Sequence, residues 1–453
     1  MRESRLPVKR QGLVCQLKRF YLYTTGSAHH WVDELQGGQA TYLLPIRQQV
    51  VPNLRSFTMK KIAITSAFFI GVSTVASQAM AEDIKLGVFL GLTGPIESLV
   101  ANMAPAAEQA IAEVSDSGKF LDGSKVEAVR ADTTCVDAAA ATAAIERLIT
   151  SDNVSGVVGG DCSGVTTAAL TNVALPNGMV MISPSATSPA LSTVEDNDLF
   201  FRTAPSDARQ GVVMTDVIMD KGHKEVALTY TNNDYGKGLA DAFQTAFEAK
   251  GGTVTISAAH EDGKADYSAE VGALASAGGE VLVVAGYIDQ GGKGIIQGSL
   301  DTGAFETFVL PDGMVGDALP EAIGPDLNGS FGQAPGTDSE GAGKLGELAD
   351  GYDASSPFAA ESYDAAALIL LAMQAAESTD PNVYKGKVMD VANAPGEQIL
   401  PGELAKALEI LASGGEIDYV GASNVELIGA GESAGNYREI EIKDGKLSTV
   451  GYR

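Results

Sequence analysis

Residues 178–189 read Gly-Met-Val-Met-Ile-Ser-Pro-Ser-Ala-Thr-Ser-Pro, so an apolar run is followed at once by a polar cluster. A short apolar run bounded by turn residues is typical of a strand buried on both faces. Four hydroxyls follow it between two prolines, at Ser183, Ser185, Thr187 and Ser188. An ordinary turn needs one or two such residues. The stretch therefore predicts a strand whose carboxyl end presents hydroxyls and amides to something small and polar.

Strands alternate with helices on both sides of this stretch. Before it, we predict strands over 84–90, 126–131 and 154–158 and helices over 98–117, 136–150 and 165–174. After it, we predict helices over 207–221, 238–250, 266–277 and 292–300 and strands over 225–230, 253–259, 281–285 and 307–310. This alternation predicts βαβ units and parallel sheets. The expected fold is α/β, with two doubly wound lobes.

The lobe boundaries follow from where the alternation restarts. We expect lobe 1 to hold residues 82–203 and lobe 2 to hold residues 204–336. No third unit emerges after that, so the tail should complete both sheets, with about 337–428 in lobe 1 and about 429–453 in lobe 2. Ligands of open α/β sheets bind beyond the carboxyl ends of the strands. The expected site is thus a cleft between the lobes.

The composition favours a soluble protein that meets small molecules. The 453 residues are 45% hydrophobic and 20% charged, which suits a packed core. The net charge of -27 argues against nucleic acid or an anionic membrane surface as a partner. No apolar run of about 18 residues follows residue 81, so no membrane span is expected there.

A secretory signal peptide is predicted over residues 59–81. Lys60 and Lys61 precede an apolar stretch that ends in Ala79-Met80-Ala81, which gives the three parts of such a peptide in order. We expect cleavage after Ala81 and a periplasmic protein. Because signal peptides stand at the N-terminus, we interpret residues 1–58 as a non-native upstream extension.

Cys135 and Cys162 are the two cysteines that would remain after cleavage, since Cys15 lies upstream. In an oxidising compartment we expect them to form a disulfide, which would stabilise the fold by roughly 3–4 kcal/mol. Two free buried thiols are the alternative. The sequence has no C-x-x-C pair and few histidines, so no metal or other cofactor is expected.

Polar groups recur just after the predicted strands, in a pattern that suits a zwitterion. Hydroxyls near a helix start, such as Ser163 and Thr187, can hold a carboxylate. Asp312 and the backbone carbonyl of Ser185 can hold an ammonium group. Each of these residues, taken alone, also has an ordinary role as a cap or in a turn. Because polar groups follow five of the predicted strands, we favour a binding site over five separate caps and turns.

The chain resembles the leucine/isoleucine/valine-binding protein family, the periplasmic receptors of branched-chain amino-acid ABC importers. The matching landmarks are Thr93-Gly-Pro95, the Cys135/Cys162 pair with Ser163 directly after it, Ser183-Pro-Ser-Ala186-Thr187, Tyr235-Gly-Lys-Gly, Gly286-Tyr287 and Pro311-Asp-Gly313. The resemblance covers nearly all of residues 82–453.

The resemblance implies a type I periplasmic binding fold with three crossovers between the lobes and a Cys135–Cys162 disulfide. It implies that Ser163 and Thr187 bind the ligand carboxylate, that the Ser185 carbonyl and Asp312 bind the ammonium, and that Ala186 belongs to the same binding loop. It further implies that Tyr235 and Tyr287 close over the ligand, that ABC permease subunits are the partners, and that the protein is a monomer.

Two departures bear on specificity. Asp312 stands where the branched-chain receptors carry Glu, and Leu99 stands where they carry a large aromatic residue. The ligand could therefore be a branched-chain or related amino acid, or instead a short amide, urea or an aromatic acid. A role as the soluble partner of a membrane sensor is a further alternative.

An enzyme is not expected. The segment around Cys162 lacks the G-x-S-x-G spacing of a nucleophile elbow, and no H-E-x-x-H motif occurs. Gly341-Ala-Gly-Lys-Leu-Gly346 matches G-x-G-x-x-G in letters, but it does not follow a predicted strand.

Overall fold

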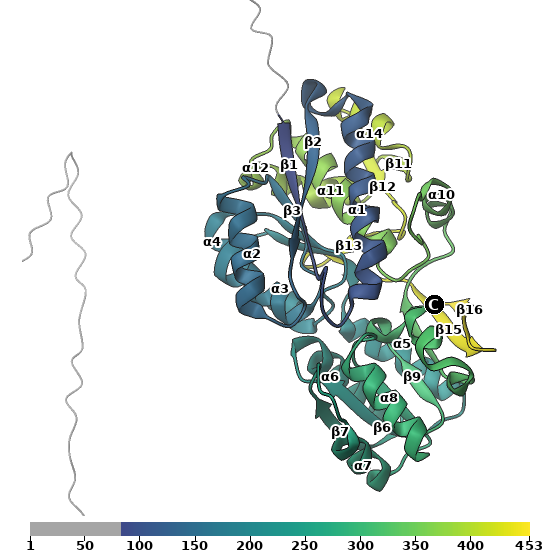
Figure 1. The fold of residues 1–453 in the computed structure, drawn as a ribbon. Coiled ribbons are helices and arrows are strands. Elements are labelled where there is room, and N and C mark those ends of the chain that lie inside the picture. Colours follow the sequence, from purple (N-terminus) through teal and green to yellow (C-terminus); the bar gives the residue numbers. More distant parts are fainter. Residues whose placement is uncertain (1–82) are drawn as a thin grey trace, which may run out of the picture. The chain divides into compact units, whose positions relative to one another are not determined.

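The computed structural model describes residues 83–453, and Figure 1 shows them as a coloured ribbon. The predicted extension, 1–58, and the predicted signal peptide, 59–81, lie outside the described residues. No helix in the described part of the chain is long and apolar enough to cross a membrane.

Lobe 1 is built on a seven-stranded sheet with the strand order β13-β14-β5-β4-β3-β1-β2. Its strands are β1 (Asp83–Leu90), β2 (Lys125–Asp132), β3 (Gly156–Gly159), β4 (Met181–Ser183), β5 (Phe200–Pro205), β13 (Leu427–Ile428) and β14 (Glu432–Ser433). The pairs among β1 to β5 are parallel, as the sequence predicted. Strands β3, β4 and β5 are buried along their whole length, because helices cover both faces of the sheet.

Helices lie on both faces of this sheet (Figure 1). One face carries α1 (Glu97–Ser117), α11 (Ala359–Ala376) and α14 (Leu404–Ala412), and the other carries α2 (Ala138–Thr150), α3 (Ser163–Ala169) and α4 (Leu175–Asn177). Helix α11 is buried almost all round, which explains its nearly unbroken apolar sequence. The short strands β11 (Glu397–Ile399) and β12 (Ile417–Tyr419) form a separate two-stranded sheet.

Lobe 2 has a second seven-stranded sheet, ordered β16-β15-β10-β9-β8-β6-β7. Its strands are β6 (Glu225–Thr231), β7 (Thr253–His260), β8 (Val281–Ala285), β9 (Phe308–Leu310), β10 (Phe331–Pro335), β15 (Tyr437–Lys443) and β16 (Lys446–Tyr452). Its longer helices are α5 (Asp207–Asp220), α6 (Asp234–Ala249), α7 (Ser268–Ala277) and α8 (Gly291–Thr302). Strand β15 runs antiparallel to both neighbours, so the sheet is mixed at one edge.

The β15–β16 hairpin turns at Asp444-Gly445. Both residues have positive φ, 53° and 68°, which is the backbone of a type I′ turn and the reason that Asp-Gly suits it.

The chain crosses between the sheets three times, as the family resemblance implied. It leaves lobe 1 after β5, which ends at Pro205, and returns after β10, which ends at Pro335. The last crossing falls between β14, ending at Ser433, and β15, starting at Tyr437. It thus lies a few residues beyond the expected boundary at 428/429, because β14 still pairs with β5.

Several short elements were not predicted from the sequence. Strands β5 and β10 sit at the crossings, and β13 and β14 are only two residues long. The predicted helix over 165–174 is split, because α3 continues into a π-helical turn, Leu170–Ala174. Such turns carry little periodic signal in sequence.

Candidate functional site

A small cavity lies between the lobes at the carboxyl ends of their strands. Its volume is about 20 Å³, and its walls are Ile96, Leu99, Asp161, Cys162, Ser163, Ser185, Tyr235, Tyr287, Asp312, Gly313 and Phe358. This is room for about one water molecule, so the structure has the lobes closed on each other. Of the predicted ligand-binding residues, all line this cavity except Ala186 and Thr187, which are buried on the same loop.

Larger hollows lie elsewhere on the described residues, and two of them, of about 770 and 360 Å³, also take residues from both lobes. Another, of about 1070 Å³, lies on lobe 2 over α7 and α8. Its lining mixes exposed charges with glycines, and lobe 1 contributes no residue to it. The small cavity is the better candidate site, because Asp161, Ser163 and Asp312 bring buried polar groups to it from both lobes.

Direct contacts hold the lobes together around the cavity. The Asp289 carboxylate of lobe 2 accepts a hydrogen bond from Ser98 N at 2.9 Å, and Asp289 N donates to Pro95 O at 3.0 Å. On the other side, Gly238 of α6 faces the binding loop so closely that a Cβ there would lie 2.9 Å from Pro189 Cδ. The missing side chain at Gly238 permits this approach.

On lobe 1, the loop after β4 is held by Ser183 and Ser163. Ala186 N donates to Ser183 Oγ at 2.9 Å, and Ser188 N donates to Ser163 Oγ at 3.1 Å. Ser163 is the first residue of α3. Its hydroxyl accepts from the loop, and its own proton stays available for an acceptor in the cavity.

The same loop leaves two backbone groups free. Within residues 83–453, no hydrogen bond reaches the Ser185 carbonyl or the Thr187 N–H, although the other peptide groups between them are bonded. The Thr187 hydroxyl is also buried without a hydrogen bond of ordinary geometry. One acceptor and two donors, adjacent along the chain, are what a molecule with an ammonium beside a carboxylate requires.

On lobe 2, Asp312 is fully buried and its carboxylate is held in place. Oδ1 accepts from Tyr235 Oη at 2.6 Å and from Gly313 N at 2.8 Å. The Tyr235 ring stacks on Tyr287 with centroids 5.3 Å apart, and Tyr287 Oη accepts from Asn233 Nδ2 at 3.2 Å. Burial raises the pKa of both tyrosines well above 10, so both hydroxyls keep their protons.

A second carboxyl, Asp207, accompanies Asp312. The Gln210 amide nitrogen, oriented toward the two acids, donates to Asp207 Oδ1 at 2.7 Å and to Asp312 Oδ1 at 3.3 Å. Burial, and for Asp207 also the charge of Asp312, raises the pKa of both carboxyls. The Thr187 side chain opposes this shift at Asp207. A cation placed beside the pair would relieve the cost of the two buried negative charges.

Asp161 also lines the cavity and was not singled out from the sequence. Its carboxylate accepts from Gly91 N at 2.6 Å and from Thr133 Oγ1 at 2.7 Å. Burial raises its pKa. Because these bonds point back into lobe 1, Asp161 joins β1 to the loop after β2.

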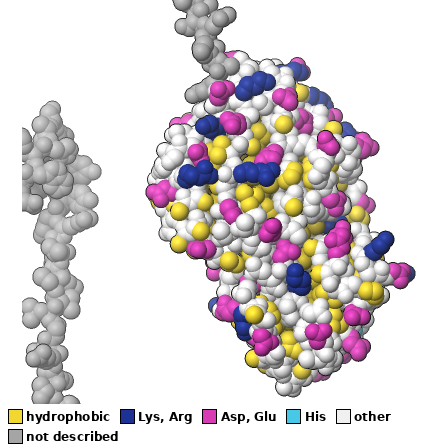
Figure 2. All heavy atoms as spheres, in the orientation of Figure 1, with side chains coloured by type: hydrophobic (Ala, Val, Ile, Leu, Met, Phe, Trp, Pro, Cys, Tyr) yellow, Lys and Arg dark blue, Asp and Glu magenta, His cyan; other side chains and the backbone are white. Residues whose placement is uncertain are grey.

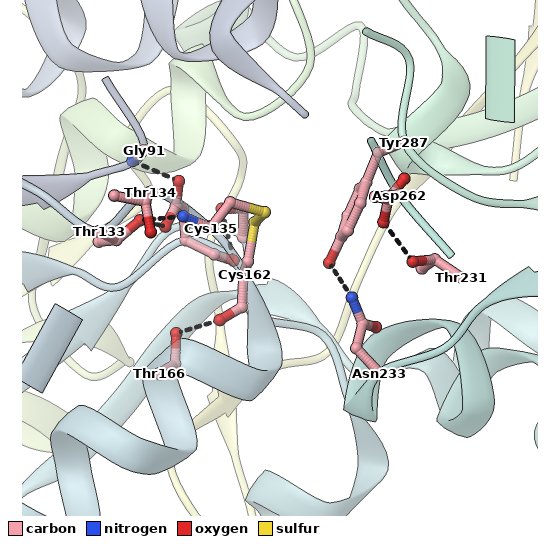
Figure 3. The surroundings of a disulfide bond; sticks show 12 residues. Gly91, Thr133, Thr134, Cys135, Cys162, Thr166, Thr231, Asn233, Asp262 and Tyr287 are labelled. Atoms are coloured by element: carbon pink, nitrogen blue, oxygen red, sulfur yellow. Dashed lines mark hydrogen bonds between the residues drawn. A yellow bond between two sulfur atoms is a disulfide. The ribbon is translucent and has the colours of Figure 1, made fainter. Parts of the chain in front are cut away.

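The Cys135–Cys162 disulfide is formed, as expected. It lies in lobe 1 directly before α3, and Figure 3 shows Tyr287 of lobe 2 standing opposite it. Since Cys162 lines the cavity beside Ser163, the disulfide fixes the start of the helix that carries Ser163. Within residues 83–453, no group of three or more His, Cys, Asp or Glu side chains could hold a metal ion.

Some residues near the site carried little signal in the sequence. Ser206-Asp207 reads as an ordinary helix start, and Gln210 is one turn further on. Phe358, at the start of α11, adds an aromatic residue to the cavity wall. Leu99, which stands where the branched-chain receptors carry an aromatic residue, also lines the cavity. Only the packing of distant segments brings these residues together.

The chain was compared with known proteins. Residues 83–386 match the periplasmic binding protein family. The chemotactic signal transduction system substrate-binding protein BasB of Halobacterium salinarum is 27% identical, over 81% of this chain and 89% of that protein. Leu/Ile/Val-binding protein homolog 3 of Brucella melitensis is 34% identical, over 54% of this chain and 65% of that protein.

Solved structures share the fold. The leucine-binding protein LivK of Thermotoga maritima superposes with a TM-score of 0.67 at 21% identity, covering 82% of this chain and 98% of that one. A solute-binding protein of Rhodopseudomonas palustris in complex with p-hydroxybenzoic acid gives 0.64 at 19% identity, covering 82% and 97%. These relatives are substrate-binding proteins rather than enzymes. The chain belongs to the periplasmic binding protein family.

Proposed function

We propose that this protein is a periplasmic receptor for an α-amino acid, which it delivers to the permease of an ABC importer. The observation that carries the proposal is the pairing of groups at the site. Asp312, Ser163 and Ser185 line the cavity, and the Thr187 N–H, which has no partner within residues 83–453, lies on the same loop as Ser185. The acceptors, Asp312 and the Ser185 carbonyl, suit an ammonium, and the donors, the Ser163 hydroxyl and the Thr187 N–H, suit the carboxylate beside it.

The charges around the site support an amine-bearing ligand. Asp161 and Asp312 line the cavity, Asp207 lies behind Asp312, and no Lys, Arg or His lines it. A buried carboxylate without a partner is costly. An aromatic acid that lacks an amine would add a negative charge here, whereas an ammonium would neutralise one.

Export is the second part of the proposal. Residues 59–81 would act as the signal peptide, with cleavage after Ala81, and the protein would work as a monomer in the periplasm. The lobes would open to admit the ligand and close around it, because the cavity in the closed structure holds about one water. On this view the closed pair of lobes, 82–203 with about 337–433 and 204–336 with about 434–453, is what the permease recognises.

A thermal-shift screen tests the ligand class. The protein is unfolded and refolded to remove carried ligand, then mixed with the twenty amino acids, urea, short amides and aromatic acids. A ligand at about 100 times its Kd stabilises the fold by about 2.7 kcal/mol, which gives a clear rise in Tm. A hit confined to aromatic acids or uncharged amides would contradict the proposal.

Asp312→Asn is the matching variant. We expect it to weaken binding of the best α-amino acid by about 3 kcal/mol or more, since the ammonium loses its buried counter-charge. Asp262→Asn is the control: Asp262 is another carboxyl in lobe 2 held by Thr231 and Gly291, and it does not line the cavity. Equal losses in the two variants would rule out the ammonium role of Asp312.

A sensory role is the second candidate, favoured by the likeness to BasB over 81% of the chain. In that case the closed form would bind a membrane receptor instead of a permease. A strain lacking the gene separates the two: lost uptake of the radiolabelled amino acid indicates transport, and lost chemotaxis toward it with normal uptake indicates sensing.

A further inference from the structure

Arg202 lies directly behind the binding loop. It is 1% exposed, the largest of the fully buried side chains among residues 83–453. One guanidinium nitrogen, Nη1, donates to the carbonyls of Ala186 and Ser188, each at 3.0 Å. These two carbonyls flank Thr187, so the guanidinium holds the loop on both sides of that residue.

The contact between Arg202 and the Ala186 carbonyl also sets the direction of the Thr187 N–H, because the two belong to one planar peptide group. In a trans peptide the carbonyl and the following N–H point in opposite directions, and no cis bond occurs between Ala186 and Thr187. Because Arg202 holds the Ala186 carbonyl, the Thr187 N–H must point away from Arg202. This is the N–H that no group within residues 83–453 bonds.

Glu432 fixes Arg202 in turn. The other guanidinium nitrogen, Nη2, donates to Glu432 Oε2 at 2.5 Å and to Ser192 Oγ at 2.7 Å. Glu432 belongs to β14 and is paired with Arg202 of β5, whose N–H also bonds Gly431 O at 2.9 Å. Strand β14 is the last element of lobe 1 before the third crossing.

We propose that Arg202, anchored by Glu432, is a positioning residue that turns the Thr187 N–H toward the ligand carboxylate and ties the binding loop to the third crossing between the lobes. The inference rests on the proposed function for the identity of the ligand. Arg202 touches no ligand in this arrangement, since its guanidinium bonds two loop carbonyls, Ser192 and Glu432. It acts through the direction of one peptide group.

A lysine could not replace this contact. A guanidinium presents several donors in a fixed plane, which lets one side chain hold two carbonyls, a hydroxyl and a carboxylate. An ammonium on a flexible stem keeps the charge and loses the plane. Arg202→Lys therefore separates the geometry of the contact from its charge.

The first experiment needs no ligand. Hydrogen–deuterium exchange of the segment 183–191 is followed by mass spectrometry in the wild type, Arg202→Lys and Glu432→Gln. We expect exchange about ten-fold faster in Arg202→Lys and a smaller increase in Glu432→Gln, because the loop opens locally more often. Glu439→Gln is the control, since Glu439 pairs with Arg453 at 2.5 Å on β15 and should leave the segment unchanged.

The second experiment asks whether the effect is specific to the carboxylate. Calorimetry gives the affinities of the same proteins for L-leucine and for L-leucinamide, which keeps the ammonium and lacks the carboxylate. We expect the preference for leucine over leucinamide to fall by about ten-fold in Arg202→Lys. A role in stability alone would lower both affinities by the same factor.

The outcomes are distinct. Unchanged exchange in both variants, or equal losses for leucine and leucinamide, would overturn the inference. If Arg202→Lys does not fold, Glu432→Gln decides by the same two measurements. If the wild type binds neither probe, it is the proposed ligand class that is in question, and the exchange rates still decide whether Arg202 orders the loop.

Discussion

Glu361 gives a prediction on stability whose size follows from the structure. It lies in α11, 3% exposed, with its carbonyl bonded by the Thr203 hydroxyl near the first crossing. Burial raises the pKa of its carboxyl from 4.5 to about 7, with a smaller contribution from Asp364, and Arg438 opposes the shift. A shift of this size corresponds to about 3 kcal/mol.

The sign follows from proton binding. Between pH 4.5 and 7 the folded state keeps the Glu361 proton while the unfolded state has lost it, so the free energy of unfolding falls as the pH rises through this window. Above pH 7 the full cost is present. Glu361→Gln removes the ionisation, and we expect the variant to be more stable than the wild type by up to about 3 kcal/mol at pH 8 and nearly equal to it at pH 4.5.

Urea unfolding at pH 4.5, 6, 7 and 8 measures this difference. Glu347→Gln is the control, because Glu347 is exposed on α10 (Glu340–Leu348); it should differ from the wild type by the same amount at every pH. The reasoning about Glu361 is refuted if the difference between Glu361→Gln and the wild type does not grow as the pH rises.

Three further predictions concern the cleft. Replacing both Cys135 and Cys162 by Ser should lower the free energy of unfolding by about 3–4 kcal/mol; reduction of the wild type should give the same loss in urea, and a loss well under 1 kcal/mol would contradict the expected role. Asp289→Ala should weaken binding of the best amino acid by about 1 kcal/mol, because the closed form loses the bond to Ser98; calorimetry with unchanged affinity would count against it. Tyr235→Phe should cost about 1.5–3 kcal/mol of binding, since its hydroxyl bonds the buried Asp312 carboxylate, whereas Tyr287→Phe should cost less than about 1 kcal/mol; the reverse order would show that the partners are misjudged.

Most of the fold could be predicted from the sequence because helices and apolar strands alternate regularly along the chain. Helices such as α1 and α6 have clear periods, strands such as β6 and β8 contain buried apolar runs, and the alternation of the two leaves few topologies. Strands β5, β10 and β14 escaped prediction because they stand where the chain crosses between the sheets, and because each pairs on one side with a distant segment. Pairing of that kind is a property of the whole chain.

The candidate site was predictable where residues follow strands directly. Ser163, Ser185 and Asp312 stand at strand ends, and their polarity is visible against the apolar runs before them. Asp207 was missed because it reads as an ordinary helix start, and Arg202 was missed because the strand that holds it, β5, was not predicted. Both residues contact the binding loop after β4: Arg202 donates to the Ala186 carbonyl, and Asp207 N donates to the Thr187 carbonyl. These contacts form only when distant segments pack together.

The acidic side chains of the chain are distributed over its surface. Figure 2 shows acidic side chains spread over both lobes on the face in view, and basic side chains that do not merge into one patch.

Gly238 affects how far the two lobes can close, as well as how α6 packs against the binding loop. A helix would be more stable with Ala at this position by about 1 kcal/mol, yet a methyl group there would meet Pro189 Cδ at 2.9 Å. We expect the Gly238→Ala methyl group to block full closure of the lobes. The ligand would still reach lobe 1. Small-angle scattering would show a ligand-bound protein that stays expanded. Under the proposed function, such a variant would bind its ligand on lobe 1 without forming the closed surface that a membrane partner would recognise.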